Sequence, residues 1–201
     1  MAISRELFES GLTIDEFKAQ MQHNREKLEH SEAQAVIPPE ERALYASLPA
    51  PLNVLVLAED WCPDVVAGLS LVSKLAHETG KLNVRVLLRD QHLDVADQYL
   101  KEGKYRSIPV LVFFDQDMRE IGHLIERPAR ATAEMRAARE RYIAEHPENH
   151  ELSMPTDQQS EETHALLAQV GRDVRSQRTA IWTRYLLEDI HALLEGVAAQ
   201  A

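Results

Sequence analysis

The residues that build covalent cross-links, metal clusters and phosphate-binding loops are scarce in this sequence. Its 201 residues include one cysteine, Cys62, which excludes an intrachain disulfide, a two-cysteine redox couple and a cysteine-rich zinc site. The 7 glycines are scattered, so the usual glycine-rich phosphate-binding and dinucleotide-binding loops are absent. The 9 histidines form no His-Glu-x-x-His motif, and we interpret them as surface residues. We therefore predict neither a metal site nor a bound cofactor.

Positive charge and long apolar runs are also scarce. The chain has 33 acidic against 22 basic residues, and this net charge of -11 repels nucleic-acid phosphates and anionic membrane surfaces. No apolar run approaches the roughly 20 residues that span a bilayer. Charged residues interrupt the first ten residues, which argues against an export signal. We expect a cytoplasmic protein that binds neither nucleic acid nor membrane, and one thiol suits that reducing compartment.

The apolar pattern predicts one central domain with helical appendages. Thr13-Ile-Asp-Glu16 is a capping box, and Phe17, Met21 and Leu28 follow it at roughly helical spacing, which predicts a helix. An apolar stripe near the C-terminus predicts a long helix that packs on the N-terminal helices or on a second copy, as a homodimer. The predicted parts are a helical extension (1–51), a central domain (52–145), a linker (146–156) and a C-terminal helix (157–201).

The central domain has the order strand, helix, strand, helix, strand, strand, helix. A helical crossover joins the first two strands, as parallel pairing requires, and a hairpin joins the last two. This order predicts an α/β fold with a mixed four-stranded sheet and helices on both faces. The first predicted strand begins at Leu52, and the other three cover 82–88, 108–114 and 120–126. The first predicted helix of this domain ends at Gly80, and the other two cover 93–100 and 130–144.

Two short motifs sit at defined places in this order. Trp61-Cys62-Pro63-Asp64 forms the first strand-to-helix turn, and Ile108-Pro109 opens the third strand. Together with the element order, these motifs resemble the thioredoxin fold over about Leu52 to Glu145. The acidic segment from Glu59, and Arg89-Asp90 after the second strand, look like a bacterial thioredoxin-like family of poorly defined function. Some of its members also lack a second motif cysteine.

Two positions depart from the thioredoxin pattern. Val65 stands where the family has its resolving cysteine, and Val56 stands where thioredoxin has a buried acid. A two-cysteine reductase resolves its mixed disulfide internally, which this chain cannot do. The resemblance therefore implies a thiol that needs an outside partner.

The reactivity of Cys62 depends on opposing local effects. A position at the start of a helix stabilises a thiolate, and Pro63 suits the first helical turn. Glu59, Asp60 and Asp64 oppose a further negative charge. If the loop from Lys104 to Ser107 approaches the sulfur, it offsets them, and we predict a modestly activated thiol. The alternative is a buried cysteine that acts only as a small apolar residue.

Neighbouring residues each have a structural and a functional interpretation. Trp61 either packs or offers a partner an apolar platform beside Pro63. Asp64 either shuttles a proton or, as we favour, only caps the helix. The resemblance implies a cis peptide bond before Pro109, with the backbone of Ile108 free to pair with an extended substrate. Arg106 and Ser107 either contact an anionic ligand group or are solvated loop residues.

Arginines gather in two places between acidic residues. We interpret both clusters as solvated helix faces with ion pairs rather than as sites for an anionic partner. The clusters are Arg127, Arg130, Arg136, Arg139 and Arg141, and Arg172, Arg175 and Arg178.

Two functional hypotheses remain. The first is a monothiol thioredoxin-like protein that performs thiol-disulfide exchange or forms thiol adducts at Cys62. Its partner would be a disulfide-bearing protein or a low-molecular-weight thiol, with glutathione as a possible external resolving thiol. The second is a redox-inactive protein-interaction module that keeps the thioredoxin fold for its surface.

Overall fold

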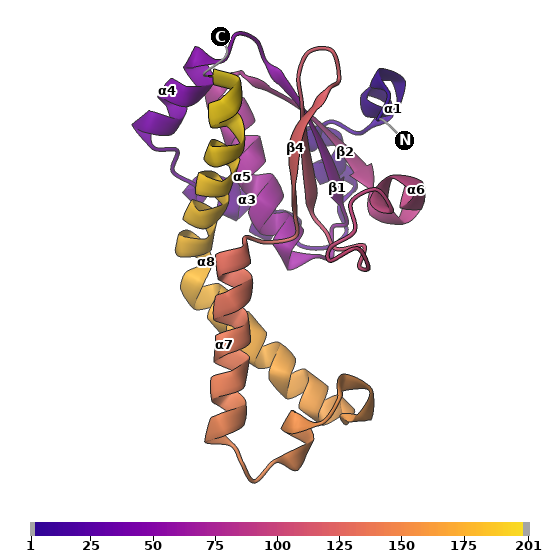
Figure 1. The fold of residues 1–201 in the computed structure, drawn as a ribbon, viewed down its shortest axis with the longest axis vertical. Coiled ribbons are helices and arrows are strands. Elements are labelled where there is room, and N and C mark those ends of the chain that lie inside the picture. Colours follow the sequence, from indigo (N-terminus) through magenta and orange to yellow (C-terminus); the bar gives the residue numbers. More distant parts are fainter. Residues whose placement is uncertain (1–2, 199–201) are drawn as a thin grey trace. The chain divides into compact units, whose positions relative to one another are not determined.

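The computed structural model describes residues 3–198 and contains the predicted mixed four-stranded sheet (Figure 1). Its strand order is β2-β1-β3-β4. β1 pairs parallel with β2 and antiparallel with β3, and β3 pairs antiparallel with β4. The strands are β1 (Leu52–Ala58), β2 (Leu82–Leu88), β3 (Val110–Phe114) and β4 (Glu120–Ile125). Every residue of the two central strands is buried, which explains their continuous apolar sequences.

Eight α-helices and three short 3-10 helices lie within the described chain. The helix after β1 ends where predicted, because Gly80 adopts a left-handed conformation (φ 63°) that glycine tolerates without steric cost. The helices are α1 (Arg5–Ser10), α2 (Ile14–Gln20), α3 (Arg25–Gln34), α4 (Pro39–Ser47), α5 (Pro63–Thr79), α6 (Leu93–Ala96), α7 (Ala129–Glu145) and α8 (Glu161–Ala198). The 3-10 helices are η1 (Arg89–Gln91), η2 (His150–Ser153) and η3 (Thr156–Gln158).

The helix predicted to run from Thr13 towards Leu28 is in fact two helices. The capping box forms as predicted, with Thr13 and Glu16 hydrogen-bonded reciprocally at the start of α2. Met21, the C-cap of α2, leaves the helical conformation (ψ 128°), and Asn24, with a left-handed backbone (φ 55°), is the N-cap of α3. The apolar residues keep a helical spacing across this break, because both helices bury their apolar side against the same core.

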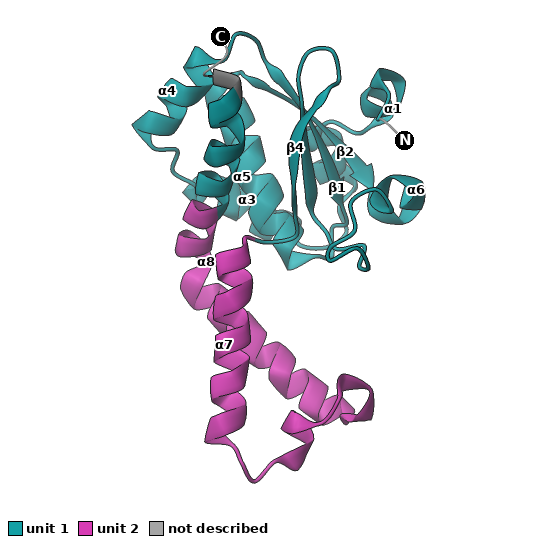
Figure 2. Ribbon diagram, in the orientation of Figure 1, with its two compact units in different colours: residues 1–127, 186–201 teal, residues 128–185 magenta. Residues whose placement is uncertain are grey.

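The structure divides into two compact units, residues 1–127 with 186–201 and residues 128–185 (Figure 2). The N-terminal extension belongs to the unit that contains the sheet. Leu12 exchanges two backbone hydrogen bonds with Val86 of β2, at 2.9 and 2.8 Å, and Phe8, Phe17 and Leu28 are each at most 1% exposed. The predicted parts 1–51 and 52–145 therefore do not coincide with the compact units. Only a shared core explains the burial of the extension.

The C-terminal part of α8 packs into the first unit. Leu186, Leu187, Ile190 and Leu194 belong to the hydrophobic core. The His191 Nδ1 atom lies 2.8 Å from a carboxylate oxygen of Glu41 on α4. This part of α8 therefore contacts one of the N-terminal helices, and packing on a second copy stays a prediction. Residues 199–201 of the predicted helix lie outside the described residues.

The second unit is built from α7, η2, η3 and the first part of α8. Its central contact is the Glu134 carboxylate, which accepts hydrogen bonds from Arg178, from Trp182 Nε1 at 2.7 Å and from the Tyr185 hydroxyl at 3.0 Å. The predicted linker contains η2, whose Leu152 is buried. These contacts make residues 128–185 a folded unit rather than a linker followed by an isolated helix.

Candidate functional site around Cys62

Cys62 lies at the end of the turn that connects β1 to α5. It is the N-cap residue of that helix, with Pro63 as the first helical residue, as the sequence predicted. The backbone N–H of Val66 donates to the Cys62 carbonyl at 3.3 Å, which closes the first turn. The sulfur therefore sits at the positive end of the dipole of a 17-residue helix, a position that stabilises a thiolate.

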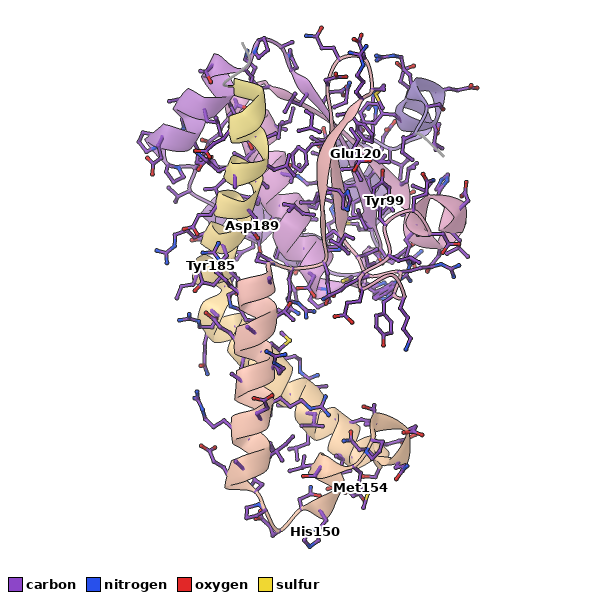
Figure 3. The ribbon with its side chains drawn as sticks, viewed as in Figure 1. Tyr99, Glu120, His150, Met154, Tyr185 and Asp189 are labelled. Carbon is purple, nitrogen blue, oxygen red and sulfur yellow. The ribbon has the colours of Figure 1, made fainter. Side chains whose placement is uncertain are left out.

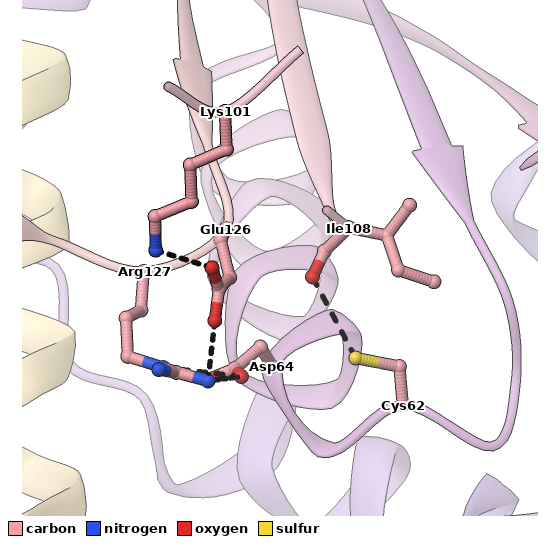
Figure 4. A network of polar contacts seen from close by, with 6 residues as sticks. All are labelled: Cys62, Asp64, Lys101, Ile108, Glu126 and Arg127. Atoms are coloured by element: carbon pink, nitrogen blue, oxygen red, sulfur yellow. Dashed lines mark hydrogen bonds and ion pairs between the residues drawn. The ribbon is translucent and has the colours of Figure 1, made fainter. Parts of the chain in front are cut away.

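The Cys62 sulfur faces the segment that precedes β3. The thiol donates to the backbone carbonyl of Ile108 at 3.6 Å, and the Ile108–Pro109 peptide bond is cis, as predicted (Figure 4). Cys62 is 7% exposed, whereas the adjacent Trp61 is 49% exposed. Cys62 is thus a buried residue, and the next residue towards the N-terminus is a half-exposed aromatic one.

Behind the sulfur, Asp64 forms an ion pair that the sequence did not predict. Arg127 donates to its carboxylate from Nε at 3.1 Å and from Nη2 at 2.5 Å. The Asp64 side chain is 7% exposed and that of Arg127 is 18% exposed. This ion pair is a contact of Asp64 beyond the helix cap that the sequence predicted. Arg127 is not on a solvated helix face, because it precedes α7 and points into the first turn of α5.

A bend at the end of β4 positions Arg127. Glu126 adopts a left-handed backbone (φ 66°), which ends the strand one residue before the predicted end. Its N–H donates to the Pro109 carbonyl at 2.7 Å, and its carboxylate binds both Arg127, at 2.6 Å, and Lys101 (Figure 4). The segment that faces the sulfur is thus tied directly to the segment that carries the arginine.

The charges around Arg127 favour its charged form. Burial works against the guanidinium, but the hydrogen bonds to Asp64 raise the pKa of Arg127 above its usual value. The charges of Asp64, Glu126 and the Cys62 thiolate act in the same direction. Arg127 therefore stays protonated and provides a permanent positive charge behind the thiol.

The other two acids near Cys62 are held by backbone N–H groups. Asp60 accepts from the N–H groups of Gln22 and His23, at 2.6 and 2.9 Å. Burial alone would raise the pKa of Asp60, but these bonds, with His23 first, lower it below its usual value. Glu59 accepts from the N–H of Asp90 at 2.8 Å. Their hydrogen bonds partly satisfy the carboxylates that were expected to oppose a thiolate.

The loop residues predicted to bind substrate lie around the same turn. The Arg89 guanidinium stacks over the Trp61 ring, 5.3 Å from its centroid, and donates to the Arg106 carbonyl at 3.2 Å. The Arg106 side chain forms a two-point ion pair with Asp97, at 2.6 and 2.9 Å. Ser107 precedes Ile108 and is half-buried. The structure brings these residues together, and their roles in binding stay predictions.

Comparisons with known proteins agree with this architecture. A family model described as Thioredoxin matches residues 11–141. The chain belongs to the thioredoxin family. The crystal structure of a protein of unknown function from Pseudomonas aeruginosa has the same fold, with a TM-score of 0.68, 16% identity, and coverage of 98% of this chain and 99% of that chain.

A second solved structure, of an HIV epitope-scaffold, has a TM-score of 0.63 and 15% identity, and covers 95% of this chain and 96% of its own. At these identities both structures show the fold alone. No curated protein matches the sequence.

Two departures from the family pattern are visible in the core of this thioredoxin-family chain. Val65, at the position of the resolving cysteine, and Val56, at the position of the buried acid, are both fully buried. The ion pair of Asp64 with Arg127 instead brings charge to the base of the site. Sequence reasoning missed Arg127, Glu126 and Lys101, since nothing in the sequence signals a contact over such separations.

A cavity lies away from this site. Its volume is about 440 Å³, and its polar lining consists of Gln98, Tyr99, Glu120 and His123. Tyr99 and Glu120 are labelled in Figure 3. The Tyr99 hydroxyl donates to Glu120 at 3.0 Å, and His123 Nδ1 lies 2.6 Å from the other carboxylate oxygen. Within the described residues, no group of three or more His, Cys, Asp or Glu side chains could hold a metal ion. Nor does any described helix combine the length and apolar character needed to cross a bilayer.

Proposed function

We propose that this thioredoxin-family protein performs thiol-disulfide exchange through Cys62 alone, and that an external thiol such as glutathione completes each cycle. The observation that carries the proposal is the position of the sulfur. It lies at the N-terminus of α5 and faces the backbone of Ile108 next to the cis proline. The helix dipole favours the thiolate, which is the nucleophile in exchange.

The proposed cycle uses two disulfide exchanges. In the first, the Cys62 thiolate attacks one sulfur of a substrate disulfide, the substrate S–S bond breaks, and the other substrate sulfur leaves as a thiolate that takes a proton from water. In the second, an external thiolate attacks the mixed disulfide and releases Cys62 as a thiolate. Over the cycle one external thiol is consumed and ends in a disulfide with the substrate sulfur that Cys62 had bound; when that sulfur belongs to glutathione, the product is glutathione disulfide.

Substrate recognition would use the open side of the site. Trp61 and Pro63 are both exposed and would offer apolar surface to a partner, and the backbone at Ile108-Pro109 would pair with an extended chain of that partner. Arg106 and Ser107 border the same segment, where they would meet a carboxylate of the partner. The proposed partners are a disulfide-bearing protein of the cytoplasm and a low-molecular-weight thiol such as glutathione.

Turnover of a glutathione mixed disulfide tests the proposal. The wild-type protein is compared with Cys62→Ser, with glutathione as the reductant and the formation of glutathione disulfide as the readout. We expect turnover by the wild type and only the uncatalysed rate with Cys62→Ser. Equal background rates for both proteins would leave the redox-inactive interaction module as the function of this fold.

A further inference from the structure

We propose that Arg127 is a positioning residue that sets the ionisation of Cys62, because it neutralises Asp64 in the first turn of α5. The use of the resulting thiolate rests on the proposed exchange function. The control of ionisation does not, because it concerns the thiol itself.

The need for such a residue follows from the position of Asp64. Asp64 lies two residues after Cys62, and its carboxylate is almost completely removed from water. A buried negative charge beside a thiol disfavours a second negative charge, and weak solvent screening strengthens this effect. Without compensation, Asp64 would cancel the benefit that the helix N-terminus gives the thiolate.

The geometry of Arg127 provides that compensation. Its guanidinium makes a two-point contact with the Asp64 carboxylate through Nε and Nη2. Its neighbour Glu126 holds the same guanidinium at 2.6 Å and is itself balanced by Lys101. The four side chains sum to zero charge, so the loss of Arg127 alone leaves a net negative charge behind the sulfur.

The remaining charged groups near the turn have their own partners. Asp60 and Glu59 accept backbone N–H groups, of Gln22 and His23 in one case and Asp90 in the other. Arg89 stacks over Trp61 and contacts Asp90, while Arg106 pairs with Asp97. The ion pair of Asp64 with Arg127 is therefore the contact through which a single substitution changes the charge directly behind Cys62.

The chain offers a clean probe of this effect. Cys62 is its only cysteine, so every thiolate signal belongs to that residue. The experiment measures the ultraviolet absorbance of the thiolate against pH, with Cys62→Ser as the blank. The variants are Arg127→Gln, Arg127→Lys, Asp64→Asn and the double variant Asp64→Asn with Arg127→Gln. Circular dichroism of each variant confirms that it is folded.

We expect Arg127→Gln to raise the apparent pKa of Cys62 by on the order of one unit, since a nearby opposite charge shifts a pKa by about 1–3 units. The double variant should reverse most of this shift and bring the apparent pKa of Cys62 back towards the wild-type value, because it also removes the carboxylate that Arg127 neutralises. Arg127→Lys should restore part of it, since lysine keeps the charge but not the two-point contact.

The matched control is Arg119→Gln, which changes the net charge by the same amount. Arg119 lies in the β3–β4 hairpin and pairs with Asp117. It should leave the Cys62 titration unchanged. A folded Arg127→Gln protein with wild-type titration, or an equal shift in Arg119→Gln, would overturn the proposal. An absence of exchange activity with the expected titration shifts would instead reject only the proposed function.

Discussion

At the level of single residues, the state of Cys62 depends on a balance between the helix terminus and the acids beside it. The helix N-terminus contributes about 0.3–1 kcal/mol to an exposed anion, and more when the anion is partly buried. An unpaired buried carboxylate opposes it by a comparable or larger amount. In the structure, Arg127 pairs with Asp64 and two backbone N–H groups donate to Asp60, and both contacts weaken the opposition of these acids to a thiolate.

The half-exposed ring of Trp61 allows a test that separates function from stability. Trp61→Ala removes an exposed surface, so we expect its free energy of unfolding to change by at most about 0.5 kcal/mol. Exchange with a peptide disulfide should slow several-fold, because the partner loses its apolar contact beside the sulfur. Steady-state kinetics and urea unfolding measure the two effects. Trp61→Phe is the control that should recover much of the rate, and an unchanged rate in Trp61→Ala would assign the ring no part in binding.

Sequence reasoning found the residues at this site that act locally and missed those that act across the fold. Cys62 and Pro63 were predicted because a turn before a helix is a local pattern, and the cis bond at Pro109 followed from a family resemblance. Arg127 contacts a residue 63 positions away, and only the paths of β4 and α5 bring them together. Because acidic residues alternate with the arginines of its cluster, we predicted that Arg127 lies on a solvated helix face, which was wrong.

At the level of elements, the contact between α5 and the segment before β3 is tight. A Cβ atom on Gly68 would lie 3.0 Å from Cγ of Pro109. Glycine here lets the helix approach the proline next to Ile108, whose carbonyl accepts the Cys62 thiol, so the spacing of these two elements depends on a missing side chain.

Gly68→Ala tests this spacing. Alanine gains about 1 kcal/mol of helix propensity, but overpacking against Pro109 costs about 1–3 kcal/mol, so we expect a net loss of roughly 1 kcal/mol. Urea unfolding measures it. Gly196→Ala is the control, because nothing lies within 4 Å of a Cβ atom there, and it should not destabilise the protein. Stabilisation by Gly68→Ala would show that the two elements can move apart freely.

The N-terminal helices form part of the core and are not a removable extension. Phe17 of α2 is 1% exposed and belongs to the same cluster as β1 and α5. Phe17→Ala should therefore cost about 3–5 kcal/mol, and the milder Phe17→Leu less than about 1.5 kcal/mol. Urea unfolding measures both, with Val36→Ala as the control because Val36 is 79% exposed. A loss below about 1 kcal/mol in Phe17→Ala would mean that the helices dock only loosely.

At the level of the whole molecule, the unit of residues 128–185 has an acid-sensitive centre of its own. Hydrogen bonds from Arg178 first, and then from Trp182 and Tyr185, lower the pKa of Glu134 from 4.5 to about 2. Because the folded-state pKa lies below the unfolded one, this stabilisation is present above about pH 4.5 and is lost as the pH falls towards about 2.

Acidification should therefore loosen this unit more in the wild type than in Glu134→Gln. The fluorescence of Trp182, recorded in a Trp61→Phe background, reports the change, because the chain has 2 tryptophans. Glu140→Gln is the matched control on α7, since the Glu140 side chain is 70% exposed and 3.9 Å from Arg136. It should follow the wild type. Identical acid profiles for wild type and Glu134→Gln would show that the carboxylate does not contribute to the stability of the unit.

The sheet of the whole molecule could be predicted, but its division into units could not. Continuous apolar runs and crossover lengths are local features, which is why the four strands, the parallel pair β1 and β2 and the antiparallel pair β3 and β4 could be predicted. The compact units depend on which distant side chains share a core. Phe17 and Leu194 join the same core from opposite ends of the chain, and no short-range pattern reports that.

Val65, fully buried where a dithiol protein would carry its second sulfur, has a practical consequence for finding the natural partner. Workers who study two-cysteine enzymes must mutate the second cysteine to make a covalent complex last long enough to isolate. Here the wild-type protein, in the absence of a reductant, would itself hold a partner in a lasting mixed disulfide. Under the proposed exchange function, disulfide-bearing partners would remain attached through Cys62 and could be identified by mass spectrometry.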